Sequence, residues 1–186
     1  HWPEAKLEGM VITRYGHGLP TKLIQVIEAG HPVPDEAGLN GAKETLRLIR
    51  TLQPGDQLIA LISGGGSSLL TLPAADLSIQ DLQTTTQALL MSGAPIGQMN
   101  IVRKHLSGIL GGHMAREAAD RGAKVDAFLI SDVTGDHPSS IASGPCAPDE
   151  STFADALQIL KDYDLLQGQI PKVVTDYLQN GLSGKN

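Results

Sequence analysis

A glycine-rich run is the strongest chemical signal in the sequence. Residues 63–68 read Ser-Gly-Gly-Gly-Ser-Ser and directly follow an apolar run, residues 57–62, with the pattern of a strand. Three glycines allow a tight turn in which several backbone N–H groups point the same way and hold an anion. We predict that this loop binds phosphate or carboxylate, with Ser67 or Ser68 capping a following helix. The residues assigned to this site are Ser63, Gly64, Gly65, Gly66, Ser67 and Ser68.

The glycine run has a simpler alternative, which is a tightly packed turn without a ligand. The loop lacks the Gly-Lys-Ser/Thr ending of a Walker A motif, so it is a weaker signal than a complete phosphate-binding loop. Both interpretations remain open from the residues alone.

Two carboxylates follow another expected strand. Asp132 and Asp136 lie in the run Ser-Asp-Val-Thr-Gly-Asp, directly after the apolar residues 125–130. Open α/β sheets bind ligands at the carboxyl ends of their strands, where a carboxylate can hold Mg²⁺ or accept a proton from a hydroxyl group. We predict catalytic roles for both, as a Mg²⁺ ligand or as the acceptor of a proton, and the residues alone do not decide between these roles. The alternative is an Asx-turn in which Asp132 bonds its own backbone.

A basic segment offers a third group of candidates. Residues 100–105 read Asn-Ile-Val-Arg-Lys-His. Arg103 presents a planar fork for carboxylate or phosphate, Lys104 adds a point charge, and Asn100 suits the cap of their helix. We assign Arg103 to catalysis, and Asn100 and Lys104 to substrate or phosphate binding. The alternative is a solvated helix face. His31, as a lone histidine in a proline-rich turn, receives no site role.

The elements that must position these groups alternate between strand and helix. Strand patterns occupy residues 9–14, 22–28, 57–62 and 125–130. Helical patterns occur around residues 42–49, at 82–90 after a capping box from Ser78 to Asp81, at 106–120, after Ser151 or Thr152, and from Pro171. Right-handed crossovers between such strands predict a Rossmann-like three-layer α/β/α domain with a mostly parallel sheet covered on both faces.

The composition limits the classes of partner. The 186 residues carry a net charge of −6, which argues against a nucleic-acid surface, and no apolar run approaches the length of a membrane span. The single cysteine, Cys146, cannot form an internal disulfide and fits a reducing cytoplasm. We therefore expect a cytoplasmic protein with small-molecule ligands and with neither nucleic-acid nor membrane partners. A homodimer is one assembly compatible with the sequence.

Several segments together resemble the glycerate 2-kinase family. They read TRYGHG at 13–18, EAGHPVPDE at 28–36, LISGGGSSLL at 61–70, NIVRKHLS at 100–107, GGHMA at 111–115 and SDVTGDHPSSIASGP at 131–145. The resemblance implies ATP-dependent phosphorylation of D-glycerate to 2-phosphoglycerate, with ATP and Mg²⁺ as cofactors. Some members of the family are labelled hydroxypyruvate reductase.

The resemblance also implies a two-domain protein with its active site between the domains. Residues 1–186 correspond to the central and C-terminal part of the large Rossmann-like domain, and an upstream Gly-Lys segment and a small C-terminal domain would lie outside them. The implied roles are a phosphate or substrate loop at 63–68, a basic substrate helix at 100–105 and an acidic loop at Asp132 and Asp136. Asp132 would act on the glycerate 2-hydroxyl and Asp136 would bind Mg²⁺, although the two roles could be exchanged.

The sequence departs from the family pattern at three places. Leu110 stands where the family more often has a basic residue, His113 where it has Arg or Lys, and Cys146 where it has Thr. These departures weaken any assignment of phosphate binding to positions 110 and 113.

Two competing functions remain. An NAD(P)H-dependent hydroxypyruvate reductase would also suit a Rossmann-like sheet, but residues 64–69 lack the third glycine of the dinucleotide fingerprint, although Asp81 lies near the expected position of its acidic residue. The other alternative is a non-catalytic anion-binding fragment. The residues and the resemblance agree best on phosphoryl transfer.

Overall fold

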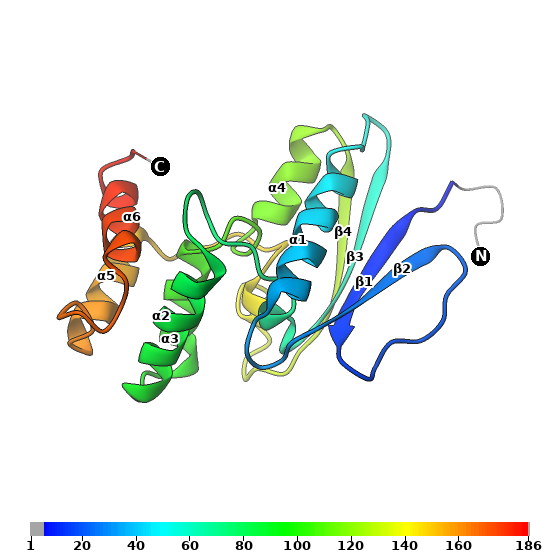
Figure 1. Ribbon diagram of the computed structural model, residues 1–186. Helices are drawn as coiled ribbons and strands as arrows, with labels where there is room; N and C mark the ends of the chain where they lie inside the picture. Colours follow the sequence, from blue (N-terminus) through cyan, green and yellow to red (C-terminus); the bar gives the residue numbers. More distant parts are fainter. Residues whose placement is uncertain (1–5, 186) are drawn as a thin grey trace.

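Two parallel strand pairs form the centre of the fold (Figure 1). The computed structural model describes residues 6–185. Strand β1 (Gly9–Arg14) pairs in parallel with β2 (Ile24–Ala29), and β3 (Gln57–Ser63) pairs in parallel with β4 (Lys124–Ile130). All four expected strands are confirmed, with ends that move by two residues at most. The parallel pairing of the α/β class is also confirmed.

One layer of helices covers the β3–β4 pair. Helix α1 (Glu36–Ile49) and helix α4 (His113–Asp120) lie side by side in Figure 1 and share a buried cluster with the two strands. The expected apolar face of α1 is confirmed. Its cluster includes Ala42, Leu46 and Ile49 from α1, Ala60 from β3 and Met114 from α4.

The opposite face of this strand pair is open within the part of the chain that the structure describes. Leu61, Phe128 and Ile130 are 78%, 61% and 73% exposed. Side chains alternate between the faces of a strand, so these residues lie on the face turned away from the helical layer. The expectation of helices on both faces is therefore not met by residues 6–185, and their four strands form two pairs where we expected one sheet.

A second core lies among four helices on the side of α1 and α4 away from the strands (Figure 1). These helices are α2 (Ile79–Met91), α3 (Ile96–His105), α5 (Phe153–Asp162) and α6 (Lys172–Leu182). Leu89, Val102, Leu160 and Leu178 are almost fully buried there. The predicted capping box from Ser78 to Asp81 is confirmed, and Thr152 with Asp155 forms another at the start of α5. The expected helical tail is therefore real.

The connection between α3 and α4 differs from the prediction. We expected one helix at 106–120, but α3 ends at His105 and α4 begins at His113. Gly111 and Gly112 have left-handed φ angles of 62° and 87°, which a continuous helix does not tolerate. Their N–H groups donate to the carbonyls of Ser143 and Gly144 at 3.0 and 2.7 Å. The turn is thus held by hydrogen bonds from a distant segment.

Two further local predictions were wrong. Asn100 lies inside α3, whose N-cap is Pro95, so it does not cap that helix. The glycine run leads into a single 3-10 turn, Gly66–Ser68, whose N-cap is Gly65, so neither Ser67 nor Ser68 caps a helix. Among residues 6–185, every helix falls short of the length and apolarity needed to cross a bilayer.

Helix α1 supports the chain just after the glycine run. A Cβ atom added to Gly38 would lie 2.8 Å from the backbone oxygen of Leu69, a contact that real Cβ atoms essentially never make. Leu69 directly follows the 3-10 turn. Only glycine therefore lets α1 approach the glycine loop this closely.

This contact predicts opposite effects of the same substitution at two helical glycines. An alanine in a helix is normally about 1 kcal/mol more stable than a glycine. At Gly97, in the first turn of α3, an added Cβ meets nothing within 4 Å, so Gly97→Ala should raise the free energy of unfolding. Gly38→Ala should lower it by about 1–3 kcal/mol, because the backbone of Leu69 must move. Urea denaturation of both full-length variants tests this, and equal stabilisation would contradict the contact.

Candidate functional site

The loops after β3 and β4 meet at the carboxyl ends of these strands. The register pairs Ser63 with Ile130, and the N–H of Gly64 donates to the carbonyl of Ile130 at 3.0 Å. A Cβ atom on Gly64 would lie only 1.9 Å from Cγ of Asp132. The Asp132 carboxyl group therefore rests directly on the backbone of the glycine loop, and the structure brings the two strongest sequence candidates together.

The Asp132 carboxylate forms no hydrogen bond with the neighbouring backbone in the described part of the chain. Val133 N–H donates to the Ser131 hydroxyl at 3.3 Å, so the serine makes the turn contacts here. Within residues 6–185, Asp132 accepts no hydrogen bond. The Asx-turn alternative is therefore not realised, and the exposed carboxylate remains available to a ligand.

The loop after β2 adds a residue that sequence reasoning missed. His31 Nε2 lies 3.2 Å from the position of a Cβ on Gly65, whose φ angle of 76° is left-handed. His31 follows β2 in the way that the glycine run follows β3, and this shared position was the signal that could have found it. The nearby Asp35 caps α1 by accepting from Gly38 N–H at 3.0 Å, so its carboxylate is already engaged.

A strained turn closes another side of the glycine loop. Ala142, Ser143 and Gly144 have consecutive left-handed φ angles of 49°, 58° and 59°. This conformation costs about 1–2 kcal/mol for each residue with a side chain. The Cβ of Ala142 lies 3.3 Å from the position of a Cβ on Gly66. Strain of this kind concentrates at functional sites, where the surrounding structure enforces it.

Two buried polar atoms lack hydrogen bonds in the described part of the chain. They are Oγ of Ser143 and Oδ1 of Asn100. Buried polar atoms are nearly always paired, so such exceptions mark places where a ligand, a water molecule or another segment belongs. The Oδ1 atom of Asn100 is therefore buried and unpaired among the described residues, although Asn100 caps no helix.

Asp136 occupies the far end of the acidic loop. It is exposed and has a left-handed φ angle of 51°, next to Gly135. No group of three or more histidine, cysteine or acidic side chains within residues 6–185 could hold a metal ion by itself. Mg²⁺ is often bound through one or two carboxylates together with substrate phosphates, a mode that needs no such group of protein side chains.

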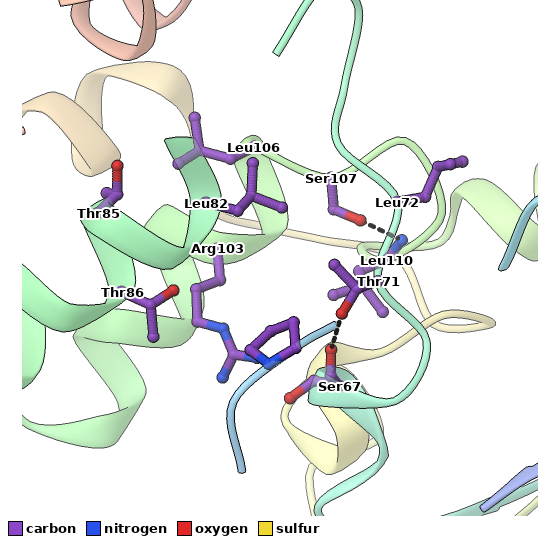
Figure 2. Close-up of a pocket in the computed structure, with 11 residues that line it drawn as sticks. Ser67, Thr71, Leu72, Leu82, Thr85, Thr86, Arg103, Leu106, Ser107 and Leu110 are labelled. Atoms are coloured by element: carbon purple, nitrogen blue, oxygen red, sulfur yellow. Dashed lines mark hydrogen bonds between the residues drawn. The ribbon is translucent and has the colours of Figure 1, made fainter. Parts of the chain in front are cut away.

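Arg103 and Lys104 point to different surroundings although they are neighbours in α3. Arg103 lines a small cavity of about 20 Å³ together with Ser67 and Thr71 (Figure 2). Lys104 is 8% exposed, and its Nζ donates to Oδ1 of Asp149 at 2.6 Å. The structure does not bring both cations to one ligand, and it also excludes a solvated face for Lys104.

The Lys104–Asp149 pair belongs to a buried network. The N–H and hydroxyl groups of Ser151 also donate to Asp149, at 3.0 and 2.7 Å. Burial would raise the pKa of Asp149, but the hydrogen bonds from Lys104 and Ser151 hold it below its ordinary value. The network ties α3 to the segment before α5, which is an architectural role.

A second, larger cavity of about 470 Å³ opens beside this network. Cys146 lines it, and burial raises the pKa of this thiol to about 11. The thiol is therefore protonated near neutral pH and is a poor nucleophile. His113 also lines this cavity, and its Nδ1 contacts the Ser107 carbonyl at 3.1 Å.

The family model described as "Domain of unknown function (DUF4147)" matches residues 1–179. The chain belongs to this family. A relative named "Glycerate 2-kinase" from Pyrococcus horikoshii is 44% identical over 178 residues, covering 96% of this chain and 40% of the relative. A relative named "Putative hydroxypyruvate reductase" from Agrobacterium vitis is 48% identical, covering 97% of this chain and 46% of the relative.

Solved structures agree with the family. A crystal structure of a Pyrococcus horikoshii protein matches with a TM-score of 0.90 and 43% identity, covering 97% of this chain and 41% of that one. A crystal structure of glycerate kinase from Thermotoga maritima matches with a TM-score of 0.83 and 43% identity, covering 92% and 40%. The resemblance to glycerate 2-kinases and the α/β fold are confirmed. The chain spans less than half the length of these proteins.

The contact between Gly64 and Asp132 predicts a coupling between two substitutions. Gly64→Ala should displace the Asp132 side chain and lower the free energy of unfolding by about 1 kcal/mol, because its methyl group overlaps the free end of an exposed side chain that can turn away. Combined with Asp132→Ala, which removes that group, the same change should cost less than about 0.5 kcal/mol. Denaturant unfolding of the two single variants and the double variant completes the cycle. Additive effects would show that the two loops do not touch.

Proposed function

We propose that the protein transfers a phosphoryl group from ATP to D-glycerate and forms 2-phosphoglycerate. The observation that carries this proposal is the Asp132 carboxyl group resting on Gly64. Phosphoryl transfer needs a cradle for phosphate beside a group that orients or deprotonates the attacking hydroxyl. The names of the relatives from Pyrococcus horikoshii and Thermotoga maritima, both glycerate kinases, support the same reaction.

Each loop of the site has a role in this reaction. The backbone of Gly64, Gly65 and Gly66 and the hydroxyl of Ser67 hold an anionic group of the nucleotide or of glycerate. Asp132 accepts the proton of the 2-hydroxyl group or orients that hydroxyl. Arg103 supplies positive charge.

Asp136 is the proposed ligand of Mg²⁺, directly or through water. When bound, the ion would supply positive charge that offsets the charge of the phosphate groups. The exposure of Asp136 suits a cation that arrives with its nucleotide. Lys104 acts indirectly in this proposal, because its pairing with Asp149 holds α3 in place rather than contacting substrate.

The wider setting follows from the family and is part of the proposal. The chain would form the central and C-terminal part of a Rossmann-like domain, and the remaining length of its relatives would supply a Gly-Lys segment and a small second domain. We propose a cytoplasmic enzyme, with a homodimer as one possible assembly, whose partners are D-glycerate and ATP. The net charge of −6 supports the absence of a nucleic-acid partner.

A reductase that uses NADH or NADPH is the second candidate, because relatives at 48–50% identity bear the hydroxypyruvate reductase name. The geometry favours the kinase. A dinucleotide site places pyrophosphate at the start of a long helix that follows the glycine turn. Here the glycine loop opens only the three-residue turn Gly66–Ser68. A non-catalytic anion-binding module would also use the glycine loop, but it would give the Asp132 carboxylate no function.

The proposal predicts a large loss of turnover without Asp132. Asp132→Asn in the full-length protein should reduce kcat for ATP-dependent phosphorylation of D-glycerate by about 100-fold or more, because a general base is lost. Coupled detection of ADP measures the rate. Asp120→Asn, at the exposed end of α4, is the matched control and should leave kcat unchanged.

Three outcomes would contradict this assignment. An unchanged kcat in the Asp132 variant would remove this residue from the mechanism. If the wild-type protein forms no ADP with D-glycerate but oxidises NADH or NADPH with hydroxypyruvate, the reductase is the correct function. If it does neither yet binds D-glycerate or ATP, the binding-module alternative holds.

A further inference from the structure

The Arg103 guanidinium occupies a small cavity next to the glycine loop. Figure 2 shows its side chain reaching from α3 into the space between Thr86 of α2 and Ser67 of the loop. The hydroxyl groups of Ser67 and Thr86 make no hydrogen bond within residues 6–185. Three donor groups from separate elements thus line one cavity with free bonding capacity.

The guanidinium itself has no counter-charge in the described part of the chain. No ion pair or hydrogen bond joins Arg103 to another residue among 6–185. Its burial lowers the pKa of Arg103 from the ordinary value. The neighbouring Lys104, by contrast, is fully matched by Asp149. Proteins rarely keep a buried charge unpaired, so the position of Arg103 indicates an anion that arrives from outside this chain segment.

The size and the lining residues of the cavity limit which anions can bind beside Arg103. Its volume of about 20 Å³ has room for one or two water-sized groups. A planar carboxylate fits this space and matches the guanidinium fork, whereas a chain of nucleotide phosphates does not. Leu72, Leu82, Leu106 and Leu110 also line the cavity and keep its dielectric low, which strengthens a charged hydrogen bond.

We propose that Arg103, with the hydroxyl groups of Ser67 and Thr86, forms the subsite that binds the carboxylate of the substrate and selects 2-hydroxy acids over uncharged polyols. This inference rests on the proposed function, and it assigns the substrate carboxylate and the nucleotide phosphates to separate subsites. The carboxylate lies against Arg103, and the nucleotide phosphates lie against the backbone of Gly64 to Gly66. Ser67 adjoins both, so the substrate hydroxyl is directed toward the glycine loop.

Steady-state kinetics of Arg103→Met in the full-length protein test the division. KM for D-glycerate should rise by about 100-fold, which corresponds to about 2.8 kcal/mol at 1.4 kcal/mol per tenfold change. KM for ATP should stay within about twofold, because uniform binding of the other substrate is untouched. Arg103→Lys, which keeps the charge and loses the fork, should lie between. Arg121→Gln, on the exposed end of α4, is the control.

Thermal denaturation without ligand gives a readout that separates binding from a merely structural role. Arg103→Met should raise the midpoint by about 2–4 °C, because it removes a desolvated charge that no residue among 6–185 offsets. D-Glycerate should raise the midpoint of the wild type, because a ligand that binds the folded protein stabilises it. It should leave the midpoint of the variant unchanged, because the variant no longer binds it. Glycerol, which lacks the carboxylate, should shift neither protein.

The outcomes distinguish this inference from the proposed function. If wild-type protein binds D-glycerate in calorimetry without phosphorylating it, and Arg103→Met abolishes binding, the subsite stands and the kinase proposal fails. If the kinase is active and Arg103→Met changes KM for ATP instead, the cavity takes phosphate and the inference is wrong. A lower midpoint with both KM values unchanged would show that Arg103 pairs with a carboxylate of the protein, which also overturns it.

Discussion

The close approach of the Asp132 carboxyl group to Gly64 is the contact on which the site depends. This approach is possible because β3 and β4 run in parallel and their last residues, Ser63 and Ile130, lie opposite each other. Parallel strands present their carboxyl ends at one edge, so both following loops leave the sheet at the same level. A side chain at position 64 would occupy the space of the carboxyl group and separate the anion cradle from the acid.

Helix α3 belongs to the helical core and presents its neighbouring side chains to different surroundings. Val102 is fully buried in the helical core, Lys104 is neutralised by Asp149, and Arg103 reaches toward the glycine loop. Successive residues of a helix point about 100° apart, so three neighbours serve three different environments. The paired lysine anchors the helix, and the unpaired arginine keeps its charge for a ligand.

Several features of this region lower the free energy of unfolding. Ala142 and Ser143 adopt left-handed backbone conformations, Arg103 carries an unmatched charge, and Asn100 and Ser143 hold unpaired buried oxygens. Each feature opposes folding, and the two well-packed cores offset them. Ala142 lies beside Gly66, and Arg103, which has no ion pair among residues 6–185, lines a cavity with Ser67. Strain and uncompensated charge of this kind are expected next to a site that is shaped for binding rather than for stability.

The sequence by itself determined the strands, most helices and the capping box at Ser78, because periodicity, turn residues and caps are local signals. It also located the glycine loop and Asp132, since both directly follow strand patterns. Only the tertiary structure decided that Asp132 lies against Gly64, that His31 joins them, and that 106–120 breaks at Gly111 and Gly112. It alone separated Arg103 from Lys104, because Asp149 comes from a distant segment. Contacts between distant segments depend on register and packing, which neighbouring residues in the sequence do not encode.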